Sequence, residues 1–216
     1  MKYPGYYRSD SDLEKSPCNP SSWGQRVLIC FIAGIAVLLA TYMGLYQWRL
    51  IDHVWDPVFD GQTQYVLDSD VSHHLRIWFR IPDSIMGAVA YLGDILFALA
   101  GSTRRWHDRP WLVIIFGIDV IPLGVVSATL VFMQGKVVGA WCFPCLITAT
   151  VSITLIFLAY GEVGACVAYL RAVWKKSKSK RLLWDTFWGK ASQIAFDAAK
   201  EVILERERKA MGKKGK

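Results

Sequence analysis

Residues 27–46 read VLICFIAGIAVLLATYMGLY, a run of 20 residues without a charge. At about 1.5 Å rise per residue, a helix of this length covers about 30 Å, the thickness of the hydrocarbon core of a bilayer. A polar segment precedes the run and no small-x-small cleavage site follows it. We therefore interpret the run as a retained transmembrane helix and not as a cleaved signal peptide.

Three further apolar blocks of similar length follow along the 216-residue chain. They are residues 84–101, which contain Asp94; residues 111–132, which contain Asp119 and Pro122; and residues 142–161, which carry no charge. Hydrophobic residues make up 53% of the chain and concentrate in these blocks. This pattern predicts an all-α membrane protein built as a bundle of four transmembrane helices.

The distribution of Lys and Arg predicts how the bundle is oriented. Residues 1–26 hold four, the 102–110 loop three and the segment from Arg171 onward fourteen, against three in the 47–83 loop and one, Lys136, in the 133–141 turn. The positive-inside rule then places both termini in the cytoplasm and the 47–83 loop outside. The net charge of +7 follows from this topology, and no nucleic-acid-binding motif accompanies it.

These features divide the chain into a cytoplasmic tail (1–26), a membrane bundle (27–172) and a basic cytoplasmic tail (173–216). In the last part, a single amphipathic helix is predicted, whose apolar face lies on anionic lipid or packs on a partner. Residues 209–216 are predicted to be disordered. The predicted apolar face of the tail helix consists of Trp184, Phe187, Trp188, Ala191, Ile194, Ala195, Ala198 and Val202.

In the outer loop, Val71, Leu75, Trp78 and Phe79 have helical spacing, which predicts a short helix on the membrane surface.

The sequence Trp141-Cys142-Phe143-Pro144-Cys145 stands where the outer turn enters the last span. Residues three apart lie on one face of a helix, within reach of a disulfide. The positive end of the helix dipole and its free N–H groups stabilise a thiolate, and Pro fits a first helical turn. The outer side of a bacterial inner membrane, or the lumen of an organelle, permits disulfides. Cys142 and Cys145 are therefore the candidate catalytic residues, as a redox pair.

Other interpretations of the pair remain open. A Cys-x-x-Cys can be half of a zinc site, for which the nearest outer-side ligands are His73 and His74, but a structural site needs four ligands. The two cysteines can also be plain packing residues. We predict no metal ligands. Cys18, Cys30 and Cys166 lie near the cytoplasmic side, with Cys166 beyond the end of the fourth helix, and are interpreted as packing or surface residues.

Two acids fall inside predicted spans, Asp94 and Asp119, at about the same depth. Intramembrane acids indicate function by default. They either share a proton or a cation, or make a polar contact between helices that Arg104 or Arg105 reaches. Glu162 lies near the predicted interface, and no role is assigned to it.

The order of these features resembles the vitamin K epoxide reductase family over roughly residues 25–165. The resemblance rests on a Cys-x-x-Cys that opens the last of four helices, on Trp141 before it, and on a path from outer loop to second helix formed by Val66-Leu67-Asp68-Ser69, Ser72, Ile81-Pro82, Gly87 and Tyr91. It implies a bundle around a quinone of the menaquinone or ubiquinone type. By the resemblance Cys145 faces the quinone, Cys142 exchanges with a thioredoxin-like or other thiol protein, and Asp83 lies near the quinone.

The chain departs from the family pattern in two places. Family members usually carry two relay cysteines in the outer loop, whereas this chain has no cysteine between Cys30 and Cys142, and Thr63 stands near the second relay position. Where members often have a tyrosine, four residues past the second cysteine, this chain has Ala149. The favoured function is a membrane thiol:quinone oxidoreductase that supports disulfide formation. The alternatives are a non-catalytic accessory subunit or scaffold of a larger membrane complex, and a metal or haem site at His73 or His74.

Overall fold

We describe residues 9–214 of a computed structural model, without the side chains of residues 10–11, 74–76, 79 and 213–214. In this part of the chain the regular elements are helices, as the hydrophobic pattern predicts. They are α1 (Asp10–Glu14), α2 (Trp23–Gln47), α3 (Gln62–Leu67), α4 (Asp70–Phe79), α5 (Asp83–Leu99), α6 (Arg105–Asp108), α7 (Pro110–Met133), the π-helix η1 (Gln134–Val138), α8 (Phe143–Ser177), α9 (Lys180–Phe187) and α10 (Gln193–Lys214).

Among the described residues, three helices are long and apolar enough to cross a membrane: α2, α7 continued by η1, and α8. Three of the four predicted spans are confirmed in this sense, and the protein is an integral membrane protein. The predicted second span corresponds to α5, which has 17 residues. Its transmembrane position stays a prediction. The third span continues into the predicted 133–141 turn as η1, and α8 extends 16 residues beyond the predicted end at residue 161, to Ser177.

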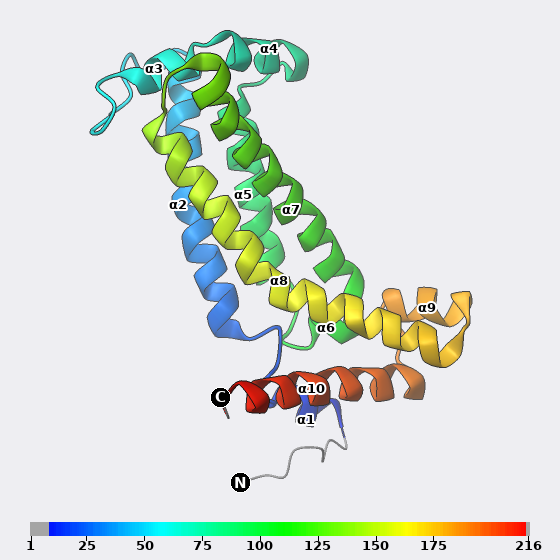
Figure 1. Ribbon diagram of the computed structural model, residues 1–216. Coiled ribbons are helices and arrows are strands. Elements are labelled where there is room, and N and C mark those ends of the chain that lie inside the picture. The colour runs from blue at the N-terminus through cyan, green and yellow to red at the C-terminus, as the bar shows by residue number, and fades with distance from the viewer. Residues whose placement is uncertain (1–8, 215–216) are drawn as a thin grey trace. The chain divides into compact units, whose positions relative to one another are not determined.

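The chain divides into two compact units. One unit, which we call the bundle unit, comprises residues 27–99 and 118–158. Its parts of α2, α5, α7 and α8 run side by side, and α3 and α4 lie across the end at which α8 begins (Figure 1). The predicted short helix in the outer loop is confirmed as α4, although the side chains of Leu75 and Phe79 lie outside the described part.

Small residues let the helices of the bundle unit approach closely. Ala33, Ala36 and Ala40 recur at helical spacing on α2 and are buried. One turn further on, a Cβ at Gly44 would overlap the side chain of Ile85 on α5. Close backbone approach of this kind gives membrane helices their van der Waals contact, since lipid provides no hydrophobic driving force between them.

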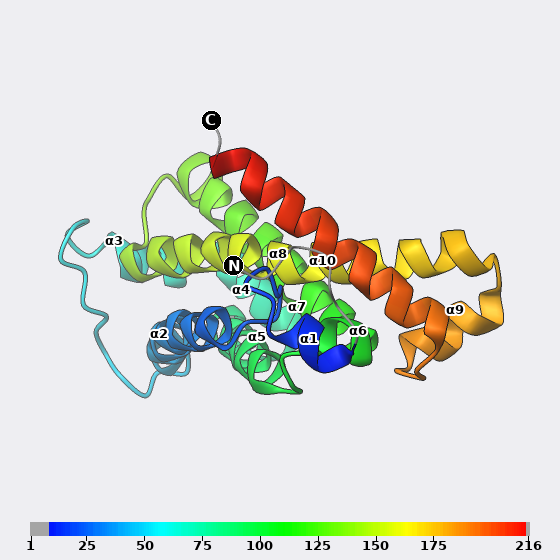
Figure 2. The ribbon, with the colours of Figure 1, turned by 90° about the horizontal axis from the view of Figure 1, so that it is seen from below.

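The other unit, which we call the terminal unit, comprises the described residues of 9–26, 100–117 and 159–214. Its core includes Leu13, Trp106, Tyr169, Ala198 and Ile203. Within it α10 runs back in the direction opposite to the last part of α8 (Figures 1 and 2).

The prediction of one amphipathic tail helix is wrong, because α9 and α10 are separate helices. The break contains Gly189, whose φ of 89° favours glycine. Of the predicted face, Trp184 is exposed, but Ala195 and Ala198 are buried within the terminal unit. The chain's own core thus covers the alanines that the sequence assigned to lipid or a partner. Residues 209–214 are helical and not disordered, and residues 215–216 lie outside the described part.

A buried ion pair lies in the terminal unit. Arg105 donates two hydrogen bonds of 2.6 Å to the two carboxylate oxygens of Glu162, and Ser21 donates a third. Arg104 instead pairs with Glu14 and Asp108. From the sequence, Glu162 was placed near the membrane interface without a role, and these arginines were candidate partners of the intramembrane acids. The structure pairs them differently, because Glu162 lies on the part of α8 that continues beyond the predicted span.

Candidate functional site

Cys142 and Cys145 form a disulfide at the start of α8, with their Cα atoms 5.2 Å apart. The helix begins at Phe143 and holds Pro144 in its first turn, as the motif predicts. Met43 on α2 faces the pair, with its Sδ 3.5 Å from Cys145 Sγ and 3.9 Å from Cys142 Sγ. The structure therefore brings the two predicted catalytic residues together next to the first long helix of the bundle unit.

Side chains from outside α8 accept hydrogen bonds from the N–H groups at its first residue and just before it, which have no acceptor within the helix. Gln62 accepts from Trp141 N–H at 3.0 Å and Thr63 accepts from Phe143 N–H at 3.0 Å. Gln134 accepts from Cys142 N–H at 3.3 Å. Thr63, near the position of a family relay cysteine, is fully buried and serves as a structural cap.

The loop before Thr63 is held by Asp56. Its carboxylate accepts hydrogen bonds from the N–H groups of Phe59 at 2.9 Å, Val58 at 3.2 Å and Thr63 at 3.0 Å. Desolvation raises the pKa of Asp56, but these bonds to the charged form lower it more, and the net pKa lies below the ordinary value of 3.8. The ionised Asp56 thus holds in place the segment that contains Thr63, the residue that caps α8.

The two cysteines have different surroundings. Cys142 is 0% exposed, in a core with Met43, Val54, Val66 and Leu67. Its Sγ also lies 3.2 Å from the N–H of Cys145. When the disulfide is reduced, this N–H and the helix N-terminus favour negative charge on the Cys142 sulfur.

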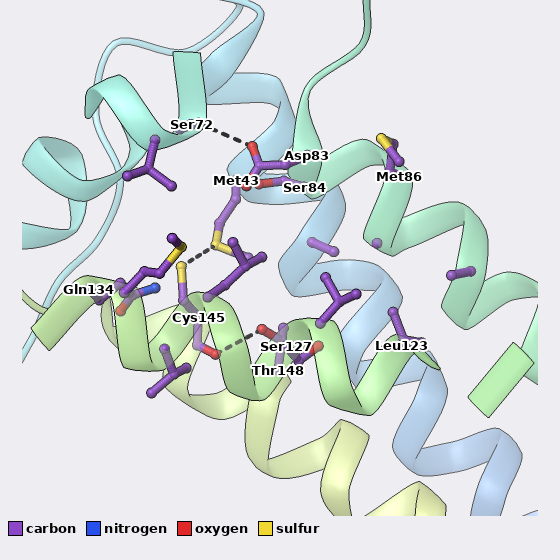
Figure 3. A pocket seen from close by; sticks show the side chains of 18 of the residues that line it. Met43, Ser72, Asp83, Ser84, Met86, Leu123, Ser127, Gln134, Cys145 and Thr148 are labelled. Carbon is purple, nitrogen blue, oxygen red and sulfur yellow. Dashed lines mark hydrogen bonds between the residues drawn. The ribbon is translucent and has the colours of Figure 1, made fainter. Parts of the chain in front are cut away.

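Cys145 lies on the wall of a cavity of about 580 Å³ in the bundle unit. The wall is mostly apolar, with Met43, Leu123 and Met86 among its side chains (Figure 3). Pockets of 300–1,000 Å³ with apolar walls and a few polar groups are typical of small-molecule sites. The sulfur of Cys145 and that of Met43 point toward one another at one part of this wall (Figure 3).

Asp83, the predicted quinone-side residue, lines the same cavity at the first turn of α5. Its Oδ1 accepts hydrogen bonds from Gln47 Nε2 at 2.6 Å and from Ser72 Oγ at 3.1 Å. Ser72, Gly87 and Tyr91, on which the resemblance rested, also line the cavity. All three candidate site residues, Cys142, Cys145 and Asp83, thus gather at the end of the bundle unit where α8 begins.

The hydroxyls of Tyr91 and Ser127, which line the cavity, meet at Ser152 on α8. Tyr91 OH lies 2.6 Å from Ser152 Oγ and donates to the carbonyl of Thr148 at 3.0 Å. Ser127 Oγ on α7 lies 3.1 Å from Ser152 Oγ. Ala149, which stands where the family often has a tyrosine, is buried. The tyrosine hydroxyl in this cavity wall comes instead from Tyr91 on α5.

Within the described residues, no group of three or more His, Cys, Asp or Glu side chains is arranged to hold a metal ion. His73 is exposed, and the side chain of His74 lies outside the described part. Of the remaining cysteines, Cys18 and Cys30 are partly buried, and Cys166 is buried. Cys166 lies inside α8 and not beyond its end, because that helix is longer than predicted.

Met43, Gln62, Gln134 and Ser152 were not predicted from the sequence to belong to this site. Met43 is one of several apolar residues of α2, and only its packing distinguishes it. Gln62 and Gln134 come from distant segments of the chain, so their convergence on one helix end leaves no local pattern. A polar residue within an apolar helix, such as Ser152, was a usable signal.

The comparison with protein-family models agrees with this geometry. A family model described as the vitamin K epoxide reductase family matches residues 27–160, more than half of the chain. The match includes both cysteines and the cavity. A comparison with curated proteins and another with solved structures found no match.

Proposed function

The chain belongs to the vitamin K epoxide reductase family, and we propose that it is a membrane thiol:quinone oxidoreductase that oxidises a protein dithiol and reduces a membrane quinone. The family suggests thiol-dependent reduction of a quinone. The proposal adds the residues: Cys142 and Cys145 carry the electrons, and the cavity beside Cys145 receives the quinone ring.

The observation that carries the proposal is the position of Cys145. Its sulfur is joined to Cys142 and lies on the wall of a mostly apolar cavity of about 580 Å³. A quinone ring is apolar on its faces and has two carbonyl oxygens that accept hydrogen bonds. The cavity offers apolar walls for the faces, and hydroxyl donors such as Ser127 for the oxygens.

The reaction consists of two exchanges that balance. A partner dithiol attacks the Cys142–Cys145 disulfide, leaves as a disulfide, and returns the pair to two thiols. The pair then re-forms its S–S bond and gives up two electrons and two protons. A bound quinone accepts two electrons and two protons and becomes a quinol. The Cys145 N–H beside Cys142 Sγ stabilises negative charge on that sulfur when it leaves or attacks.

Two further proposals concern the surroundings of the enzyme. From the Lys and Arg distribution, both termini face the cytoplasm of a bacterium and the α8 N-terminus faces the oxidising side of the inner membrane. The thiol donor is then a thioredoxin-like or other thiol protein on that side. The exposed Trp184 and Trp188, near a basic run at residues 175–181, favour contact of α9 with anionic lipid.

A thiol titration of the purified, detergent-solubilised protein tests the proposal. The pair is first reduced, a soluble quinone is added, and the cysteines are alkylated and weighed by mass spectrometry. We expect Cys142 and Cys145 to escape alkylation only after quinone is added, whereas Cys18 serves as an internal alkylation control. Changing either pair cysteine to serine is expected to abolish quinone reduction.

Two results would contradict the proposal. If the pair stays reduced in the presence of quinone, the cavity does not connect quinone to the sulfurs. If both serine variants reduce quinone as the wild type does, the sulfurs carry no electrons. Either result favours a non-catalytic accessory subunit, which would co-purify with a larger membrane complex.

A further inference from the structure

One glutamine side chain belongs both to the disulfide and to the cavity. Gln134, the first residue of the π-helix η1, is 6% exposed and lines the cavity together with Cys145. Its Oε1 accepts the hydrogen bond of 3.3 Å from the N–H of Cys142. Short π-helical turns are frequent at functional sites, because they redirect a side chain that a regular α-helix would place elsewhere.

The turn between α7 and α8 holds Gln134 in this position. The carbonyl oxygen of Gln134 accepts hydrogen bonds from the N–H groups of Gly139 at 2.8 Å and Ala140 at 3.3 Å. Gly139 has a φ of 72°, a conformation that favours glycine. Trp141 packs on Gly135, where an added Cβ would lie 2.9 Å from the indole ring. The chain therefore folds back so that residue 134 meets the start of α8.

The hydrogen bond to Cys142 decides which way the amide of Gln134 points. A backbone N–H can only donate, so the atom that meets it is the oxygen, and the NH₂ group occupies the other position. This Nε2 makes no hydrogen bond with any described residue. Figure 3 shows it on the side of Cys145. Buried amides generally use their donors as well as their acceptor, so two unused N–H groups in a cavity wall indicate a ligand.

Other donors in the cavity wall are already used by the protein. Four hydroxyl groups donate to carbonyl or carboxylate oxygens at 2.7–3.1 Å, those of Ser69, Ser72, Tyr91 and Thr148. Residue 149, one turn past Cys145 on α8, is an alanine and offers no donor. The amide of Gln134 differs from these groups, because it stands next to the disulfide with both of its N–H groups uncommitted.

We propose that Gln134 is a catalytic residue that donates a hydrogen bond from Nε2 to the quinone oxygen nearest Cys145. This inference rests on the proposed function. Two electrons and two protons pass from the thiols to the quinone as the S–S bond forms, and negative charge develops on the quinone oxygens. A donor already aimed at such an oxygen stabilises this charge. Gln134 keeps its own protons, so the balance of the reaction is unchanged.

The two ends of the Gln134 amide act together in this proposal. The bond from Cys142 N–H to Oε1 fixes the position of the NH₂ group relative to the sulfurs. Cys145 N–H in turn lies 3.2 Å from Cys142 Sγ. One side chain thus ties the position of the quinone oxygen to that of the reacting disulfide. A donor that is held before the reaction needs no rearrangement during it.

The first experiment observes the hydrogen bond without turnover. Protein with its disulfide intact has no electrons to give, so a bound quinone stays oxidised. The probe is duroquinone, a symmetric benzoquinone whose ring carbons are fully substituted and do not add thiols. Infrared difference spectra of the whole detergent-solubilised protein are expected to show a carbonyl stretch below its frequency in apolar solvent. Gln134→Met has a similar volume and no donor, and is expected to return the band toward the apolar frequency.

The second experiment follows oxidation of the prereduced pair by duroquinone. Gln134→Met is expected to slow this step about 10-fold to 100-fold, the range for losing a hydrogen bond to a developing charge. Gln134→Glu keeps an oxygen for Cys142 N–H but carries no N–H donor, so it is expected to be at least as slow. This variant separates the donor from the cap.

Gln62→Met is the matched variant for the cap alone. Gln62 accepts from Trp141 N–H at 3.0 Å, at the same helix start, but it is exposed and does not line the cavity. We expect this variant to keep the lowered carbonyl stretch of bound duroquinone. If it slows the quinone step as much as Gln134→Met does, the helix start and not the amide donor limits the step, and the proposal is overturned.

The remaining outcomes separate this proposal from the function on which it rests. If duroquinone leaves the wild-type thiols reduced, the proposed function fails and the role of Gln134 fails with it. If the wild-type thiols are oxidised, but Gln134→Met reacts at the same rate with the same carbonyl band, the role of Gln134 fails alone. A wild-type band at the apolar frequency would also overturn it.

Discussion

Cys145 lines the cavity, whereas Cys142, to which it is bonded, is 0% exposed. The proposed quinone side of the disulfide is thus open, and the proposed donor side is covered by Val54 of the loop before α3 and by Leu67 at the end of α3. A thiol protein can attack Cys142 only after this cover moves. Access to Cys142 is therefore expected to control the donor half of the reaction.

This relationship predicts that loosening the cover speeds reduction of the disulfide. Val54→Ala removes buried apolar contact over Cys142 and raises the population of open loop. We expect a soluble dithiol to reduce the disulfide several-fold faster in this variant. The rate is measured by alkylation of the freed thiols and mass spectrometry. Val58→Ala, in the same loop but 58% exposed, is the matched control. Equal rates for the wild type and both variants would show that the loop does not limit access.

Thr63 is predicted to stabilise the start of α8 through its hydroxyl. Thr63→Val keeps the shape but leaves Phe143 N–H without its acceptor, at a cost of about 1–2 kcal/mol. A lower Tm in detergent, with recovery in Thr63→Ser, would show this. Thr129→Val, at an exposed site where the hydroxyl bonds only to its own helix, is the control. An unchanged Tm in Thr63→Val would mean that the cap contributes nothing.

The hydrogen bonds of Asp56 lead to the prediction that the loop covering Cys142 loosens in acid. Its pKa in the folded protein lies below the ordinary value of 3.8, because backbone N–H groups bind the charged form in spite of desolvation. The stabilisation is therefore complete above the unfolded pKa and is lost as the pH falls through the lower folded pKa. We expect alkylation of reduced Cys142, corrected for the thiolate fraction, to rise below about pH 4.

Asp56→Asn is expected to show faster alkylation of Cys142 already at neutral pH and a weaker dependence on acid. An amide oxygen accepts weaker hydrogen bonds than a carboxylate does. Asp60→Asn, an exposed change in the same loop, is expected to behave as the wild type. If Cys142 alkylation depends on pH identically in the wild type and in Asp56→Asn, this carboxylate does not hold the loop in place.

The sequence predicted the parts of this protein that local patterns encode. Apolar runs of membrane length located α2, α7 and α8, and the Cys142–Cys145 spacing located the start of α8. It failed where distant segments meet. Glu162 was placed near the interface because the predicted fourth span ends at residue 161, but α8 continues and buries it against Arg105. The alanines of α10 fit lipid and protein contact equally well, so only tertiary packing decides between them.

The Arg105–Glu162 pair gives a last prediction, on the stability of the terminal unit. Both side chains are almost fully buried, at 0% and 2% exposure, and two bonds of 2.6 Å join them. Glu162→Gln leaves the Arg105 charge buried without a counter-charge, which is expected to cost about 3–5 kcal/mol. The Tm in detergent should fall clearly. Glu205→Gln, which breaks an exposed pair with Lys209, should change it little.

A double variant separates the value of the pair from the cost of breaking it. Replacing both residues by methionine removes both charges and keeps much of the volume, so Arg105→Met/Glu162→Met is expected to be more stable than Glu162→Gln. This order follows from the physics of desolvation, since an unpaired buried charge is worse than none. If the double variant unfolds at a lower temperature than the single one, the pair fixes the α6–α8 contact by its specific geometry and not through its charge balance.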